Sequence, residues 1–170
     1  MISPLSFAAL LVFPLLMAFA ASSDLLTMRI SNKLVFALVL GFVALALFVG
    51  LPLELIGMHF ACAAIVLVAG FAFFALGWIG GGDAKLAAAT TLWLGFGMML
   101  PYIIYASLLG GALTMILLAA RRWPLPDNIR RIAWIDRLHN EKTGVPYGIA
   151  LAAAGLLVYS QSVIFLSFMS

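Results

Sequence analysis

The sequence predicts an all-α membrane protein whose helices cross the bilayer six times. Hydrophobic residues make up 66% and charged residues only 9% of its 170 residues, and the mean hydropathy is +1.22. Soluble domains are about a quarter charged, and barrels of the outer membrane show short segments of alternating polarity, so both classes are excluded. Several uncharged stretches reach the roughly 20 residues that a helical span needs. These stretches are 1–23, 34–53, 55–82, 86–120 and 143–170.

The fourth stretch, 86–120, is too long for one crossing at about 1.5 Å per residue. We expect it to break at Pro101, because proline cannot donate to the helical ladder and disfavours helix just before itself. The six expected spans are about 3–22, 34–50, 54–76, 84–100, 102–120 and 147–168. The first of them ends in Ala18-Phe19-Ala20, which is also typical of a signal-peptide cleavage site. No Lys or Arg precedes that stretch, which favours a span that is retained.

The charges indicate how the spans are oriented. All nine basic residues lie at the first, third and fifth loops, which share one side of a chain with six spans, and the other side carries only Glu54 as a charge. Cytoplasmic loops are enriched in Lys and Arg, so this side is expected to be cytoplasmic and both termini are expected to face outward. The same rule explains the basic pI of about 9.4 without any nucleic-acid partner.

The fifth loop, 121–146, is the only sizeable segment expected outside the membrane. Within it, Ile129, Ile132, Ile135 and Leu138 recur at helical spacing among arginines. This pattern predicts a short amphipathic helix in the cytoplasmic interface. A surface helix that separates two spans is the simpler interpretation, and substrate recognition is the alternative.

Two acidic residues are the strongest candidates for chemistry. Spans two and three run out and back between Asp24 and Asp83, so both carboxylates return to the cytoplasmic boundary. Residues 86–100 would rise only about 22 Å against a hydrocarbon core of about 30 Å, so this span must begin near Asp83 or earlier. An acidic group at that depth is costly and is a functional candidate.

Two neighbouring carboxylates at one membrane face form the apparatus of an aspartic protease. Like charges a few ångströms apart share one proton, so one member takes a proton from water while the other polarises the peptide carbonyl. Asp83, at a helix N-terminus, is favoured as the anion, and Asp24, near the end of the first span, is favoured as the acid.

Three glycines precede the second aspartate. Gly80, Gly81 and Gly82 permit a close approach of another chain, and their exposed backbone groups can pair with an extended peptide. The alternative is a flexible turn in which Asp83 only caps the next helix.

Three motifs together resemble the type IV prepilin peptidases, the GxGD class of membrane aspartic proteases. Gly80-Gly81-Gly82-Asp83-Ala84-Lys85 matches the second motif of that family. Asp24 with Arg29-Ile30-Ser31-Asn32 looks like the first motif, although Ser31 stands where Pro is usual. Val145-Pro146-Tyr147-Gly148-Ile149-Ala150 is similar to the Pro-Tyr/Phe-Gly segment of the family.

The resemblance implies an activity, a substrate and a location. Asp24 and Asp83 would be the catalytic pair of an enzyme in the bacterial inner membrane. It would cleave the basic leader from a prepilin precursor on the cytoplasmic side, after a glycine. Larger relatives add a domain with paired cysteines that N-methylates the new terminus. This chain has one cysteine, Cys62, so it looks like a single peptidase domain over 1–170, the short form associated with tight-adherence (Flp-type) pili, without methylation.

The other candidate site residues carry two interpretations each. The three glycines, Lys85 and Asn32 are candidates for binding substrate. Lys85 can stabilise the negative charge of the pair or meet a substrate carbonyl, and it can equally be a positive-inside anchor. Asn32 can tie down the first loop or serve ordinary turn chemistry. The two histidines, His59 and His139, have no partners at the spacing of metal ligands, so neither a metal nor another cofactor is expected.

Two other functions compete with proteolysis. A proton- or cation-coupled transporter subunit can use two membrane carboxylates as a relay. Against it, both acids lie on one face, and no charged residue marks a path to the other. A noncatalytic membrane anchor is the third possibility, and in that case both acids would be dispensable.

Overall fold

The computed structural model describes residues 4–169, and helices are the only regular elements in that range. This confirms the all-α prediction. The eight helices are α1 (Pro4–Thr27), α2 (Asn32–Phe48), α3 (Leu53–Ala75), α4 (Gly81–Arg121), α5 (Asp127–Arg130), α6 (Ala133–His139), α7 (Tyr147–Tyr159) and α8 (Val163–Met169).

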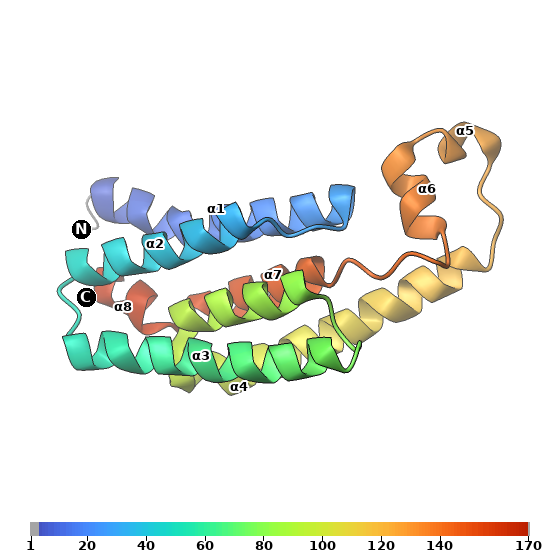
Figure 1. The fold of residues 1–170 in the computed structure, drawn as a ribbon. Coiled ribbons are helices and arrows are strands. Elements are labelled where there is room, and N and C mark those ends of the chain that lie inside the picture. The colour runs from blue at the N-terminus through green and yellow to red at the C-terminus, as the bar shows by residue number, and fades with distance from the viewer. Residues whose placement is uncertain (1–3, 170) are drawn as a thin grey trace.

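The long helices lie side by side in a bundle with α4 at its centre. The most extensive contacts join α4 to α3 and α7, and α1 to α7. Figure 1 shows α5 and α6 together at the end of the bundle where α1 and α4 both end, while α8 lies at the opposite end. Phe13, Phe42 and Trp93 are fully buried in the core, and the indole Nε1 of Trp93 donates a hydrogen bond to the Leu38 carbonyl at 3.0 Å.

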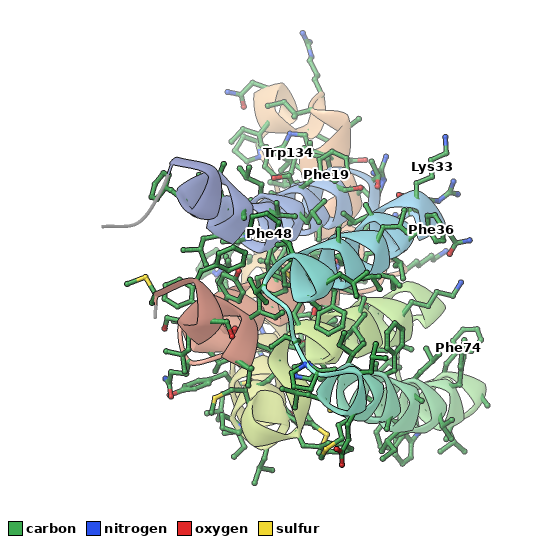
Figure 2. The ribbon with its side chains drawn as sticks, turned by 90° about the vertical axis from the view of Figure 1, so that its left-hand side faces the viewer. Phe19, Lys33, Phe36, Phe48, Phe74 and Trp134 are labelled. Carbon is green, nitrogen blue, oxygen red and sulfur yellow. The ribbon has the colours of Figure 1, made fainter. Side chains whose placement is uncertain are left out.

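Three helices are long and apolar enough to cross a membrane. They are Phe7–Thr27, Leu53–Ala75 and Gly81–Arg121, and α7 with α8 gives a fourth if this pair, bent by 40°, is one span. The helix surfaces are correspondingly apolar: the side chains of Phe19 on α1, Phe36 and Phe48 on α2 and Phe74 on α3 are exposed (Figure 2). The structure therefore supports a membrane protein, and the count of six crossings stays a prediction.

The long helix α4 reverses its direction at Gly95, so the break predicted at Pro101 is wrong. Gly95 has φ 67° and ψ −178° in an otherwise helical stretch, and Pro101 lies inside the helix that follows. Residues 81–94, the first limb, and residues 96–121, the second limb, run in opposite directions (Figure 1). A proline kinks a helix without turning it back, whereas this backbone conformation is open essentially only to glycine.

A buried histidine lies against the reversal. His59 on α3 is 2% exposed, and its Nδ1 donates a hydrogen bond to the Leu92 carbonyl at 2.7 Å. Carbonyls in the last turn of a helix lack an amide partner, so the imidazole satisfies one that the reversal exposes. A Cβ at Gly95 would lie 2.9 Å from the His59 Cε1 atom.

We expect Gly95→Ala to destabilise the fold by about 2–4 kcal/mol, because alanine is strained at this φ and also collides with His59. Thermal unfolding in detergent measures the change. Gly97→Ala is the matched control, since Gly97 has no positive φ and a Cβ added to it would meet nothing within 4 Å. Equal melting temperatures for the two variants would contradict the role of Gly95.

Three further boundaries differ from the prediction. α1 continues to Thr27, so Asp24 lies inside the helix and not in the loop after it. The single helix predicted over 129–138 is divided into α5 and α6, because Ile132 is extended, with φ −87° and ψ 104°. The last predicted span is bent between α7 and α8.

Candidate active site

A cavity of about 820 Å³ opens at the end of the bundle where α1 ends and α4 begins. Asp24 and Asp83 both line it, together with three connecting segments. These segments are 28–32 after α1, 77–82 after α3, and Gly144, Val145 and Tyr147 before and at the start of α7. The cavity is thus built from parts of the chain that are far apart in sequence.

Asp24 lies one turn before the end of α1 and is only 5% exposed. Its Oδ2 accepts a hydrogen bond from the Gly148 amide at 2.7 Å. Gly148 is the second residue of α7, and amides in the first turn of a helix have no partner within the helix. The Asp24 carboxylate therefore occupies the positive end of α7, which favours negative charge there.

Gly148 permits this contact because it has no side chain. A Cβ at this position would lie 2.8 Å from the Asp24 Oδ2 and 3.0 Å from its Cγ. The sequence pointed to this segment through the Pro146-Tyr147-Gly148 match, but it did not single out Gly148 as a site residue. Nothing in the motif shows that its amide meets a carboxylate 124 residues away.

Asp83 is the third residue of α4, and the helix begins at Gly81, as the short predicted span required. Its Oδ2 accepts a hydrogen bond from the Gly80 amide at 3.2 Å. This is the capping bond of the alternative interpretation. The same side chain also lines the cavity, so capping and a place in the site coexist.

The structure brings the two carboxylates into one cavity. Asp24 comes from the C-terminal part of α1 and Asp83 from the first turn of α4. Two carboxyl groups in such a setting can share a proton, and the pair can then act as a general base and a general acid.

The triple glycine lies where the sequence predicts a site. Gly80, Gly81 and Gly82 all line the cavity. A Cβ at Gly82 would lie 3.3 Å from the Ile30 Cβ of the first loop, so this loop and the start of α4 are in close contact. The glycines therefore form a wall of the cavity with accessible backbone groups.

The structure separates the two polar candidates, Asn32 and Lys85. Asn32, the first residue of α2, lines the cavity. Lys85 does not; its Nζ donates a hydrogen bond to the Asn32 Oδ1 at 3.0 Å, and its side chain lines an apolar groove of about 270 Å³ between α2, α3 and α4. Lys85 thus reaches the cavity through Asn32 and ties the start of α4 to the start of α2.

Tyr147 is a cavity residue that the sequence showed only as part of a motif. Its hydroxyl lies 3.0 Å from the Thr114 hydroxyl on the second limb of α4, and its ring packs on Gly110. Tyr147 therefore connects the start of α7 with α4 beside the two aspartates.

A comparison with protein families finds a match: the profile of the type IV leader peptidase family covers residues 11–115. The matched range contains both aspartates, the triple glycine, Asn32 and Lys85. This match confirms the resemblance that the motifs indicate. No curated protein and no solved structure matches the chain.

Proposed function

The chain belongs to the type IV leader peptidase family, and from this premise we propose that it is an aspartic endopeptidase with Asp24 and Asp83 as its catalytic pair. Membership makes the protein a membrane-bound protease with a prepilin as substrate. The observation that carries the aspartic mechanism is the placement of two carboxylates, on α1 and α4, in one cavity at the end of an apolar bundle.

In the proposed mechanism the two carboxylates have different tasks. Asp83 lies at the positive end of α4 and Asp24 at the positive end of α7, so both helix termini favour the one negative charge that the pair shares, and the ionised member takes a proton from the attacking water. The other member holds the shared proton and polarises the carbonyl of the scissile bond. Water then adds to that carbonyl carbon. Collapse of the tetrahedral intermediate leaves a carboxylate on the leader and an amine on the mature subunit.

The backbone of the triple glycine supports binding of an extended peptide beside the pair. Gly80 and Gly82 line the cavity next to Asp83, and the peptide groups of this segment are able to pair with a substrate strand. We propose that the residue before the scissile bond is a glycine and that the leader is basic. We further propose a precursor of the Flp type, with no N-methylation afterwards.

The proposed orientation places the cavity at the cytoplasmic face of the bacterial inner membrane. Counting α2, both limbs of α4 and the bent pair of α7 and α8 as crossings gives six spans with α1 and α3. The basic residues support this orientation, because α5 and α6, with their arginines, lie at the end of the bundle that holds the cavity (Figure 1). Both termini then face the periplasm.

Cleavage of a synthetic prepilin by the purified chain in lipid nanodiscs tests the proposal. The peptide carries a basic leader, a glycine and an apolar segment, and mass spectrometry follows both products. In water enriched in ¹⁸O, the label is expected in the new carboxylate of the leader, with no covalent adduct between enzyme and leader after an acid quench. With S-adenosylmethionine present, the mature product is expected to keep its unmethylated mass. An intact precursor or a trapped acyl-enzyme would contradict the proposal.

A further inference from the structure

The basic segment, residues 121–146, is fixed to both sides of the cavity by two arginines. It contains α5 and α6, and among the described residues Arg137 reaches back to α1, while Arg121 reaches Gly144 at the segment's own end before α7. The sequence favours a spacer role for this segment. Its contacts indicate a second role, because one ends at Leu26, two residues after Asp24, and another ends at Gly144, which lines the same cavity as Asp24.

Arg137 on α6 holds the end of α1. Its Nη1 donates a hydrogen bond to the Leu26 carbonyl at 2.7 Å. Leu26 comes two residues after Asp24, in the last turn of α1, where carbonyls have no amide partner in the helix. A guanidinium at this end also interacts favourably with the negative end of the helix dipole. The contact therefore both satisfies the carbonyl and restrains the turn that carries Asp24.

Arg121, the last residue of α4, holds the other side. Its Nε donates to the Leu138 carbonyl on α6 at 2.8 Å, and its Nη2 donates to the Gly144 carbonyl at 2.9 Å. Gly144 lines the cavity four residues before Gly148, whose amide binds Asp24. The end of α4 therefore fixes α6 and the approach to α7 together.

These contacts form a closed circuit around one catalytic carboxylate. α6 is joined to α1 through Arg137 and to α4 through Arg121, and α4 is joined to the segment that enters α7. The circuit closes where the Gly148 amide meets Asp24. We propose that Arg137 is a positioning residue, which keeps Asp24 on the Gly148 amide and at its working distance from Asp83. This inference rests on the proposed function.

The segment itself offers a matched control. Arg131 carries the same charge and is exposed, and within residues 4–169 the structure gives its side chain no hydrogen bond or ion pair. Replacing Arg131 removes the same charge from the same segment without opening the circuit. A purely electrostatic role of the segment would make the two arginines equivalent.

The test compares Arg137→Ala, Arg137→Lys and Arg131→Ala in nanodiscs with the synthetic prepilin. We expect Arg137→Ala to lower kcat about tenfold with KM changed less than about twofold, because the pair is misplaced while peptide binding is kept. Arg137→Lys should recover most of this loss, since one N–H suffices for the Leu26 carbonyl. Arg131→Ala should leave both constants within about twofold of the wild-type values.

Amide hydrogen exchange provides a readout that does not depend on cleavage. The Gly148 amide is expected to exchange faster in Arg137→Ala than in Arg131→Ala, while the melting temperatures of the variants stay close together. If the wild-type chain fails to cleave, the proposed function falls, and the exchange of Gly148 still decides whether Arg137 controls this contact.

Three outcomes would overturn the positioning role. The first is an unchanged kcat in Arg137→Ala. The second is a rise in KM alone, which would make Arg137 a contact for the leader. The third is an equal loss of kcat in Arg131→Ala, which would reduce the effect to the net charge of the segment.

Discussion

Asp24→Asn and Asp83→Asn are each expected to lower the kcat of leader removal by about 10³-fold. An amide can neither hold the proton that the pair shares nor accept one from water. The fold should persist, because asparagine has nearly the same size, and its Oδ1 can still accept the bonds that Gly148 and Gly80 donate. The single-turnover rate of cleavage, followed by mass spectrometry at equal amounts of purified variant, measures the effect.

Glu54→Gln is the matched control for these two variants. Glu54 is an exposed carboxylate in the first turn of α3, and it does not line the cavity. Its replacement removes one negative charge by the same chemical change and should leave the rate as it is. Cleavage within about tenfold of the wild-type rate in either aspartate variant would remove that residue from the catalytic pair.

Gly148→Ala is expected to lower kcat by about 10²-fold, because the added methyl group displaces the Asp24 carboxylate without changing its chemistry. The new methyl group would lie 2.8 Å from the Asp24 Oδ2 and 3.0 Å from its Cβ and Cγ, so either the carboxylate or the start of α7 must shift. A misplacement of about 1 Å at a reacting group costs about this factor. Single-turnover kinetics at saturating peptide separate this loss from weaker binding.

Gly144→Ala serves as the control for this substitution. Gly144 also lines the cavity, but nothing lies within 4 Å of a Cβ built there. Its variant should keep its activity and stability. If Gly148→Ala and Gly144→Ala cleave at the same rate, the close approach of Asp24 to α7 has no part in catalysis.

Much of the fold follows from the pattern of charge and hydropathy, because a long apolar run in a bilayer must satisfy its backbone hydrogen bonds within itself, and a helix does this. The reversal of α4 does not follow from it. The chain contains 15 glycines, and no local pattern distinguishes Gly95, which turns the chain, from Gly97, which lies in the helix two residues later. The distinction depends on His59 and α3, which pack against the turn.

The same distinction applies to the candidate site: residues that the local sequence marks were predictable, and roles that depend on distant partners were not. Asp24, Asp83 and the triple glycine were predictable, because rare charges and a local motif mark them. The placement of Lys85 away from the cavity was not, since its hydrogen bond joins residues 53 positions apart. The roles of Gly148 and Arg137 also escaped prediction, because their partners are a distant carboxylate and a main-chain carbonyl 111 residues away.

Each of the two aspartates receives a hydrogen bond from a main-chain nitrogen, at Gly148 and at Gly80. Every residue except proline has a main-chain N–H group. Replacing the side chains one at a time therefore leaves both donors in place. Their contribution becomes visible only when the peptide linkage itself is changed. An ester in place of the amide before residue 148, introduced with an α-hydroxy acid during translation, would delete one donor and spare every side chain.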